Sequence, residues 1–422
     1  MKILWLTNIP LPEASKLING FSLPYGGWLD SASESLSAIK DISLSVAFPM
    51  RGDEQIRIIV GEKIEFYAFS PNNNKFKDML IQERQFEEIL NKVEPDIVHI
   101  YGTEYPYSLV MIDKCNSKNI RSIISIQGLV SVIAKHYLGS IPPKIQKRFT
   151  FRDFVRQDNL EQQRRKFASR GKFEIEAIQK AKNIIGRTTW DRACTLQINT
   201  DVHYHFCNET LRNEFYKHVW SLDNCEKHSI FISQGSYPIK GLHFMLEAMP
   251  IILHRFPDAK LYIAGPNFVK SDTVEEKLRM SSYGKFIKEI IRKNHLMDKI
   301  EFTGLLDEKQ MCKKYLSANV FVCPSAIENS PNSLGEAMIL GVPCVASDVG
   351  GVTDMMKHRE DGFVYQVDAP YMLAYYVGEI FDNKKSTRIF GKNAREHALK
   401  THDKEKNLER LLSIYSEVIA QG

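Results

Sequence analysis

The sequence predicts an α/β fold with two doubly wound, Rossmann-like domains, and three observations support this prediction. Short runs rich in β-branched and aromatic residues alternate with longer stretches of helical period, which is typical of parallel sheets with crossover helices. This alternation stops near residue 207 and starts again near residue 228. The chain has 422 residues, which is more than one hydrophobic core usually serves.

The apolar runs are the expected strands. In the first domain they lie at residues 2–9, 44–50, 64–69, 96–102, 121–128, 183–188 and 202–206. In the second domain they lie at residues 228–236, 260–266, 299–306, 319–325, 343–349 and 362–367. Several of these runs end in Gly or Pro, where a turn into the next helix is expected.

We expect the first domain to span residues 1–207 and the second to span residues 208–404. The polar stretch 208–227 is the expected linker between them. The apolar residues of the last segment, 405–422, follow the helical period, and this helix is expected to pack back on the first domain.

The composition is that of an ordinary globular protein, with 43% hydrophobic and 25% charged residues. Its 7 cysteines include no Cys-x-x-Cys pair, which argues against a zinc site and a disulfide framework and favours a reducing cytoplasm. The apolar stretch at the N-terminus is short, so we interpret it as a strand rather than a signal peptide. No segment approaches the roughly 18 apolar residues that a spanning helix needs.

The segment ENSPNSLGEAMILG, residues 328–341, follows an expected buried strand. Glu328 then lies in the loop at the carboxyl end of that strand, where open α/β sheets hold their ligands. Ser330 is expected to cap the next helix, with Pro331 in its first position. Three amides at the start of this helix are then free for an anion or a sugar hydroxyl, those of Asn332, Ser333 and Leu334.

Glu336 lies off the apolar stripe of the same helix, so we expect it to reach the same crevice. Two glutamates eight residues apart are, by spacing alone, more often solvated surface charges. Here one glutamate follows a strand, the other lies on the adjacent helix, and free amides lie between them. This context favours a ligand that has many hydroxyls and a negative charge, and a nucleotide sugar has both.

The longer segment ENSPNSLGEAMILGVPCVASDVGG resembles the E-x7-E segment of retaining glycosyltransferases of family 4, which have the two-domain GT-B fold. The resemblance implies a cleft between an acceptor-binding first domain and a second domain that binds the nucleotide sugar. It implies that Glu328 holds the hexose hydroxyls of the donor and that Glu336 holds its ribose. The amides between them would contact the sugar or the diphosphate.

The segment ISQGSYPIKGLHFMLEAM places Lys240 at the start of a helix, where its charge opposes the helix dipole unless an anion lies between them. The segment resembles the family element in which an arginine and a lysine bind the leaving diphosphate. Lys240 matches the lysine, and Gly235 and Ser236 are expected at the donor site, although Ser236 stands where the arginine is usual. The alternative for Lys240 is a solvated surface charge.

Three segments resemble parts of the family's first domain. The turn Pro-Tyr-Gly-Gly-Trp at 24–28 resembles its glycine-rich loop and places Gly27 at the site, although a structural turn fits as well. Gln127 stands where the family often has a histidine, and a glutamine cannot exchange a proton near neutral pH. Arg187 and Asp191 either face the acceptor or pair with each other at the surface.

Metal binding is not expected. His99, His203 and His205 lie in strand-like runs without carboxylate or cysteine partners, which is typical of core or surface imidazoles. The sequence has no Asp-x-Asp pair for a divalent ion on a diphosphate. We therefore expect no cofactor beyond the nucleoside-diphosphate sugar that serves as the donor substrate, and UDP is favoured over GDP as its nucleotide.

The segment from Lys135 to Lys172 is strongly basic, with 11 Lys or Arg residues against 3 acidic residues, and it contains several aromatic residues. This combination favours contact with an anionic membrane surface or with a lipid-linked acceptor. RNA is a rival ligand because its bases stack on aromatic rings, but no nucleic-acid-binding signature accompanies the segment. A solvated insertion with inward-facing aromatics is the third interpretation.

The resulting hypothesis is a retaining hexosyltransferase that moves sugar from a nucleotide sugar to a glycan or lipid-linked acceptor. By family analogy it belongs to polysaccharide or lipopolysaccharide biosynthesis, in the cytoplasm or peripherally on the inner face of the membrane. Two alternatives stay open. One is a GT-B nucleotide-sugar epimerase, and the other is a non-catalytic protein that binds sugar nucleotides or RNA.

Overall fold

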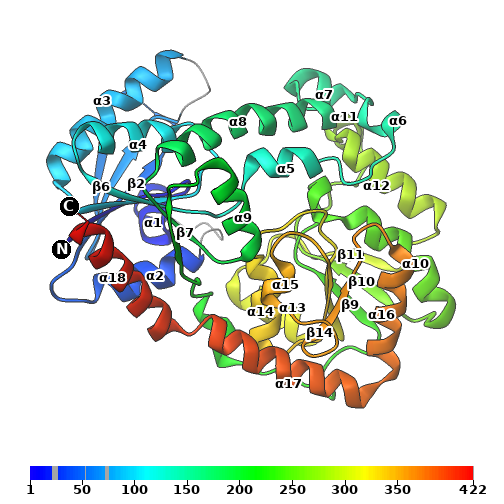
Figure 1. The fold of residues 1–422 in the computed structure, drawn as a ribbon. Coiled ribbons are helices and arrows are strands. Elements are labelled where there is room, and N and C mark those ends of the chain that lie inside the picture. Colours follow the sequence, from blue (N-terminus) through cyan, green and yellow to red (C-terminus); the bar gives the residue numbers. More distant parts are fainter. Residues whose placement is uncertain (21–26, 53, 72–75, 422) are drawn as a thin grey trace. The chain divides into compact units, whose positions relative to one another are not determined.

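The computed structural model describes residues 1–20, 27–52, 54–71 and 76–421 (Figure 1). The chain forms two compact units, which are described separately. The first unit consists of Met1–Val132, Ala168–Arg212 and His402–Gly422. The second unit consists of Ile133–Phe167 and Asn213–Thr401.

The first unit contains, within its described residues, an eight-stranded sheet in the order β3-β4-β2-β1-β5-β6-β7-β8. Its neighbouring strands are parallel, except that β3 and β4 are antiparallel. Leu4 of β1 pairs with Ser45 on one side and with Val98 on the other. The strands are β1 (Lys2–Leu6), β2 (Ser43–Pro49), β3 (Arg57–Val60), β4 (Glu65–Phe69), β5 (Ile97–Tyr101), β6 (Arg121–Ser125), β7 (Asn183–Gly186) and β8 (His203–Phe206).

Each face of this sheet has its own core because successive side chains of a strand point to opposite faces. Leu4 and Leu6 of β1 lie in a core formed with α3 and α4. Ile3 and Trp5 lie in a second core formed with α1, α2 and α18. The helices with residues in this unit are α1 (Pro12–Asn19), α2 (Gly27–Ser37), α3 (Phe76–Val93), α4 (Tyr107–Ser117), α5 (Val130–His136), α8 (Leu160–Lys180), α9 (Thr189–Ile198) and α18 (Lys404–Ala420).

The C-terminal helix α18 packs on the first unit, as expected. Figure 1 shows this helix, in red, next to α2. Ile414, Tyr415 and Val418 are fully buried there. The Tyr415 hydroxyl lies 3.1 Å from Trp5 Nε1, which donates to it, and 2.6 Å from His99 Nδ1.

The second unit contains, among its described residues, a six-stranded parallel sheet in the order β11-β10-β9-β12-β13-β14. This is the order of a doubly wound nucleotide-binding fold. The two sheets confirm the predicted fold class. The strands are β9 (Ser229–Ile232), β10 (Lys260–Ile263), β11 (Ile300–Phe302), β12 (Val320–Cys323), β13 (Cys344–Ser347) and β14 (Gly362–Tyr365).

Helices surround this sheet, and α10 packs against both α12 and α16. The helices of the unit are α6 (Pro143–Gln146), α7 (Phe151–Arg156), α10 (Leu242–Arg255), α11 (Val274–Arg279), α12 (Ser282–Lys293), α13 (Glu308–Ser317), α14 (Asn332–Leu340), α15 (Val352–Met355), α16 (Pro370–Asp382) and α17 (Lys384–Thr401), with the 3-10 turns η1 (Asn213–Lys217) and η2 (Pro238–Lys240).

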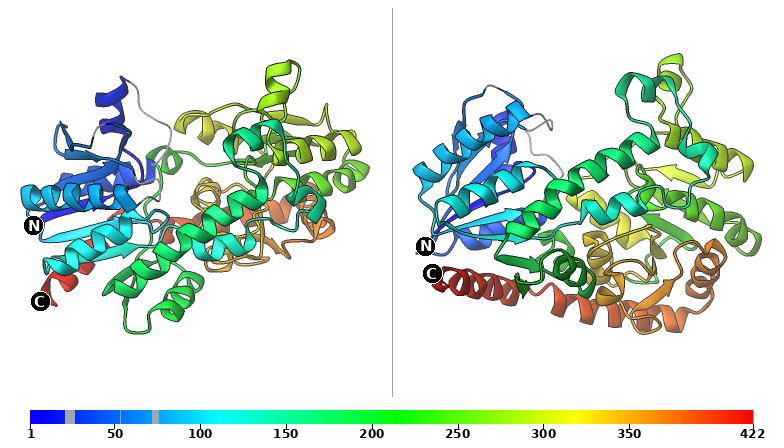
Figure 2. Two further views of the ribbon diagram at one scale, coloured as in Figure 1. Left: turned by 90° about the horizontal axis from the view of Figure 1, so that it is seen from above. Right: turned by 45° about the horizontal axis from the view of Figure 1, so that its top comes forward.

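Residues 133–167 cluster with the second unit, although their position in the sequence suggested the first domain. In this segment α6 packs against α12 and α7 against α11. Arg148 forms a salt bridge with Glu289 at 2.9 Å. In both views of Figure 2, the cyan-to-green segment that contains α6 and α7 lies beside the yellow-green helices of this unit.

The stretch 208–227, expected as the linker, divides after Arg212 between the two units. Phe215 and Trp220 are buried in the second unit. The Trp220 indole donates a hydrogen bond to the carbonyl of Ala318 at 2.8 Å. Most of this polar stretch therefore belongs to the second unit and is anchored there by two buried aromatic residues.

Candidate functional site

In the second sheet the strand order reverses between β9 and β12. Open α/β sheets bind ligands outside the carboxyl ends of their strands at such a point. Lys240 lies in the segment that leaves β9, and Glu328 lies in the loop that leaves β12. The structure therefore brings together two of the residues that the sequence placed at a donor site.

The side chains of Lys240 and Glu328 form a direct ion pair. Lys240 Nζ donates to Glu328 Oε1 at 2.6 Å. The same oxygen accepts a hydrogen bond from Ser325 Oγ at 2.7 Å. The lysine side chain is 27% exposed and the glutamate side chain 12% exposed. The interpretation of either residue as a solvated surface charge is therefore wrong.

The charge state of this pair follows from its surroundings. Burial disfavours the ammonium, but the adjacent Glu328 carboxylate outweighs this effect, so the pKa of Lys240 is raised above its usual value. Burial, and to a lesser degree the Glu328 carboxylate, raises the pKa of the Cys323 thiol to about 12. The site thus holds a permanent cation and a neutral thiol.

Two glycines allow the loops around this pair to approach each other. Gly241 has a φ of +68°, and a Cβ there would lie 1.7 Å from the carbonyl oxygen of Pro324. Gly350 has a φ of +54°, and a Cβ there would lie 1.8 Å from the carbonyl oxygen of Glu328. These positions require glycine because any other residue meets backbone atoms.

The helix after Glu328 begins one residue later than predicted. Its N-cap is Pro331, and its first residue is Asn332. The prediction that Ser330 caps the helix is wrong, because its hydroxyl lies 3.4 Å from Met355 Sδ. The prediction of a free amide at Leu334 is also wrong, because this amide donates to the Pro331 carbonyl at 2.9 Å in a tightened first turn.

The amides of Asn332 and Ser333 lie before Leu334, whose amide makes the first hydrogen bond of the helix. Within the described residues, these two amides have no hydrogen-bond acceptor. The Ser333 carbonyl accepts a hydrogen bond from the Tyr315 hydroxyl at 3.0 Å, which fixes this end of the helix. Glu336 is buried on α14 with an exposure of 5%, so its interpretation as a surface charge is wrong.

The sequence also placed Gly235, Ser236 and Gly27 at the donor site. Gly235 is buried, and a Cβ there would lie 2.8 Å from the side chain of Leu242 in α10. Ser236 is exposed. Gly27 is the first residue of α2 in the first unit. Residues 24–26 of the expected glycine-rich loop lie outside the described residues.

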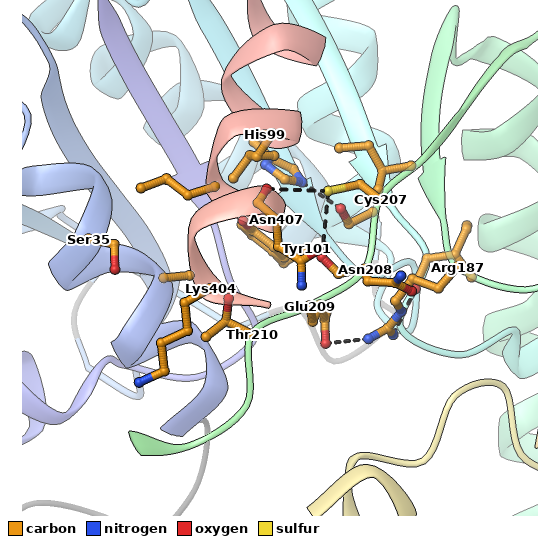
Figure 3. Close-up of a pocket in the computed structure, with 16 residues that line it drawn as sticks. Ser35, His99, Tyr101, Arg187, Cys207, Asn208, Glu209, Thr210, Lys404 and Asn407 are labelled. Carbon is orange, nitrogen blue, oxygen red and sulfur yellow. Dashed lines mark hydrogen bonds and ion pairs between the residues drawn. The ribbon is translucent and has the colours of Figure 1, made fainter. Parts of the chain in front are cut away.

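In the first unit, Gln127 and Arg187 meet at the carboxylate of Glu209. Gln127 Nε2 donates to Glu209 Oε1 at 2.7 Å. Arg187 forms an ion pair with the other oxygen, as Figure 3 shows, and also donates to the Ile126 carbonyl at 3.3 Å. The structure thus joins two residues that the sequence assigned to acceptor binding, through a glutamate that the sequence did not indicate.

Asp191 does not join this group. One of its carboxylate oxygens accepts the backbone amide of Arg187 at 2.9 Å, and the other accepts the Tyr204 hydroxyl. Both Arg187 and Asp191 are buried. The alternative of a surface pair between their side chains is therefore wrong, since Arg187 pairs with Glu209 while Asp191 stabilises the start of α9.

Arg187 and Glu209 lie at one end of a pocket in the first unit (Figure 3). The pocket is lined by β5, β6 and β7 on one side and by α2 and α18 on the other. His99 lies inside it, stacked on Tyr101 with ring centroids 3.9 Å apart. Burial lowers the pKa of His99 to about 3, so the imidazole is neutral.

Glu104 is a second candidate functional residue, after Glu209, that the sequence did not indicate. It follows β5, and the strand order of the first sheet reverses between β1 and β5. Burial, with a smaller contribution from the Glu174 carboxylate, raises the pKa of Glu104 to about 7. Its place after a buried strand was visible in the sequence, whereas its raised pKa depends mainly on burial in the folded chain.

The described ranges contain neither a metal site nor a membrane-spanning helix. No group of three or more His, Cys, Asp or Glu side chains there is arranged to hold a metal ion. Among the described helices, none is both long and apolar enough to cross a bilayer.

Most of the second unit is similar to a known protein family. Residues 214–397 match the family described as glycosyl transferases group 1. The chain is 26% identical over 190 residues to an uncharacterized glycosyltransferase of Methanocaldococcus jannaschii, covering 45% of each chain. It is 25% identical over 194 residues to the phosphatidyl-myo-inositol mannosyltransferase of Mycobacterium leprae, covering 46% of this chain and 47% of the relative. The chain thus spans less than half the length of these curated relatives.

Comparison with solved structures extends over both units. Sucrose-phosphate synthase from Thermosynechococcus elongatus has a TM-score of 0.75 at 16% identity, with 100% of both chains covered. HepE of Anabaena in complex with UDP has a TM-score of 0.67 at 14% identity, covering 99% of this chain and 100% of that one. At these identities the likeness shows a common fold, the fold of GT-B glycosyltransferases.

Proposed function

We propose that this chain, whose residues 214–397 match the glycosyl transferases group 1 family, is a retaining glycosyltransferase that uses a nucleoside-diphosphate hexose. The observation that supports the proposal is the Lys240–Glu328 pair, which lies at the reversal of strand order inside the matched domain. UDP is the favoured nucleotide, since HepE of Anabaena, which has the same fold, binds UDP.

Lys240 and the helix amides would bind the diphosphate of the donor. The ammonium is held in its charged form by Glu328, and the amides of Asn332 and Ser333 lie at the positive end of the α14 dipole. When the bond to the sugar breaks, negative charge develops on the leaving phosphate oxygens. Donors that are already in place stabilise this charge more than they stabilise the ground state, and this difference lowers the barrier.

Glu328 and Glu336 would bind the sugar hydroxyls. In this proposal Glu328 exchanges its contact with Lys240 for the hydroxyls of the hexose, while Lys240 turns to the phosphate. Glu336, which is buried on α14, would accept hydrogen bonds from the ribose. No side chain is assigned the role of covalent nucleophile. The leaving phosphate itself would accept the proton of the acceptor, which is compatible with Gln127 in place of a histidine.

The acceptor would be a glycan or a lipid-linked sugar bound by the first unit. Gln127 and Arg187 are its proposed contacts, together with Glu209, which holds both of them. The setting we propose is polysaccharide or lipopolysaccharide assembly at the cytoplasmic face of a membrane. The mannosyltransferase among the relatives acts, by its name, on an inositol lipid, which supports a lipid-linked acceptor.

Two variants of the ion pair test the donor site. We expect Lys240→Met to weaken UDP binding on the order of tenfold to a hundredfold, because a hydrogen bond to a charged group is lost. We expect Glu328→Gln to retain UDP binding, since it removes the competitor for Lys240, but to lose sugar transfer. Isothermal titration with UDP and product analysis with a panel of nucleotide sugars measure the two effects.

The control is Lys313→Met, at an exposed lysine of α13. It should leave both UDP binding and transfer unchanged, and thermal unfolding verifies that all three variants are folded. Wild-type binding of UDP in Lys240→Met would refute the site. An altered sugar that stays on its nucleotide would indicate the epimerase instead, and binding without any product would indicate a non-catalytic protein.

A further inference from the structure

Helix α7 presents its apolar side chains to solvent rather than to the protein. Phe151, Phe154 and Val155 are 60%, 67% and 64% exposed. They lie at positions i, i+3 and i+4, so they share one face of the helix. A short helix with two phenylalanines on its solvent face is the reverse of the usual amphipathic arrangement.

Helix α11 extends this surface. It packs against α7, as Figures 1 and 2 also show. Its exposed apolar residues are Val274, at 71%, and Leu278, at 44%, which are again four positions apart. We call the combined surface the apolar tip, and it consists of Phe149, Phe151, Phe154, Val155, Val274 and Leu278. Such a cluster differs from single exposed apolar residues and marks a surface that contacts something.

The opposite face of α7 is fixed to the second unit by a buried aspartate. Asp153 is fully buried, and its Oδ2 accepts the backbone amide of Ser282 in α12 at 2.9 Å. Thr150 and Asp153 form a capping box at the start of α7. The helix is therefore held in the orientation that turns its phenylalanines outward.

Three basic residues in α6, directly after it and in α7 form no ion pair within the described residues. Lys144, Lys147 and Arg156 are exposed, and in the described part of the chain none of them lies within ion-pair distance of a carboxylate. The acidic side chains nearby already have basic partners, although Arg152 is shared with Asp153 and Lys270 is shared with Asp272. These pairs are Asp158 with Arg152, Glu275 with Arg279, and Glu276 with Lys270. The tip thus combines apolar residues with an excess of available positive charge.

We propose that the apolar tip is a docking surface for an anionic lipid bilayer. The three free basic residues would bind lipid phosphates at the membrane surface, and the phenylalanine and aliphatic side chains would enter the acyl boundary. The docking surface is smaller than the whole basic segment 135–172, and it includes two residues of α11. It does not depend on the proposed transfer reaction, since vesicle binding is measured without any donor or acceptor.

The chemistry of the tip favours lipid over two other occupants. RNA would stack its bases on aromatic rings, but Val155, Val274 and Leu278 offer no such face. A second copy of the chain, joined tip to tip, would bring the free Lys144, Lys147 and Arg156 of both copies together, and like charges repel. An anionic bilayer satisfies both the apolar and the basic part of the surface.

Sedimentation with vesicles tests the proposal. The full chain should bind vesicles of phosphatidylcholine mixed with phosphatidylglycerol, and bind pure phosphatidylcholine weakly. Phe151→Ser combined with Phe154→Ser should lower the partition coefficient, and Lys147→Glu combined with Arg156→Glu should lower it by about tenfold or more. The matched control is Val219→Ser with Met297→Ser, which removes two equally exposed apolar residues elsewhere on the second unit and should bind as the wild type does.

A second measurement locates the side chain that enters the bilayer. In Phe154→Trp, the added fluorescence should be quenched by lipids with brominated acyl chains, beyond the quenching seen in the wild type. Equal vesicle binding by the phenylalanine variants and the wild type, or no added quenching, would overturn the proposal. So would a concentration-dependent dimer that the phenylalanine variants abolish, because the tip would then be an interface between copies.

Discussion

His99 of the first unit is a neutral imidazole because burial lowers its pKa, and its hydrogen bonds do not offset this effect. Its two ring nitrogens lie 2.6 Å from the hydroxyls of Tyr415 and Ser125. Both contacts are with neutral groups, so nothing there compensates a positive charge. The ring therefore acts as a structural element of the core, as the sequence predicted for a histidine in a strand.

This residue makes the stability of the fold depend on pH. In the unfolded chain His99 takes up a proton near its ordinary pKa of 6.5, but in the folded chain only near 3. The unfolded state thus binds more protons between these values, and stability is lost as the pH falls below 6.5. We expect protonation of His99 in the unfolded chain to lower the free energy of unfolding by about 2 kcal/mol between pH 7 and pH 5.

Chemical denaturation at several pH values between 7 and 5 measures this effect. The slope of unfolding free energy against pH should be smaller in His99→Asn than in the wild type. His254→Asn, at an exposed histidine of α10, should retain the wild-type slope. The assignment fails if His99→Asn and the wild type show the same slope.

At the scale of single residues, the sequence was informative for two side chains that follow strands of the second sheet. Lys240 and Glu328 were predictable because the strands before them are recognisable as apolar runs, and strand ends meet at one edge of a sheet. The free amide predicted at Leu334 was wrong, because it required knowing which residue adopts the first helical conformation. Glu209 could not be predicted, because its partner Gln127 is 82 positions away.

At the scale of elements, Gly241 joins the turn η2 to helix α10. The glycine caps α10 with a left-handed backbone, and its close contact is the carbonyl of Pro324 after β12. Two loops at the carboxyl edge of the sheet thus touch through backbone atoms. Their contact fixes the distance between the segments that present Lys240 and Glu328.

We expect Gly241→Ala to separate these loops. The left-handed conformation alone costs about 1 to 2 kcal/mol for alanine, and the clash with backbone adds to this cost. Denaturant unfolding should therefore show a larger loss for Gly241→Ala than for Gly304→Ala. Gly304 is the matched control, since its φ is +78° and a Cβ there meets nothing within 4 Å. Equal losses in the two variants would contradict the proposed contact.

The elements themselves were largely predictable from the sequence. All thirteen apolar runs named from the sequence contain strands of the two sheets. The missed strand is β3, Arg57–Val60, which is short, lies at the sheet edge and is mostly exposed. It lacks the buried apolar pattern on which such predictions rest, and its stability comes from pairing with β4. Tertiary pairing of this kind cannot be inferred from a local pattern.

At the scale of the whole molecule, the last helix completes the core of the first unit. Tyr415 of α18 bonds Trp5 of β1, which lies 410 positions earlier in the sequence. We expect Tyr415→Ala to destabilise the first unit by about 3 to 5 kcal/mol, the usual cost of removing a large buried aromatic side chain. Hydrogen exchange followed by mass spectrometry measures the opening of each unit separately.

Peptides from β1, β2 and β5 should exchange faster in Tyr415→Ala, while peptides from β9 and β12 keep their wild-type protection. Tyr375→Ala is the control, since Tyr375 lies on α16 of the second unit and is 50% exposed. It should leave protection in the first unit unchanged. Loss of protection in β9 and β12 as large as in β1 would show that the two units unfold as one.

The return of residues 402–422 to the first unit also determines when that unit can be finished during synthesis. A ribosome would release the whole of the second unit before it releases Tyr415. Until then the cavity that α18 fills beside Trp5 stays open to water or to chaperones. In the growing polypeptide, the unit that begins first is therefore the one that matures last.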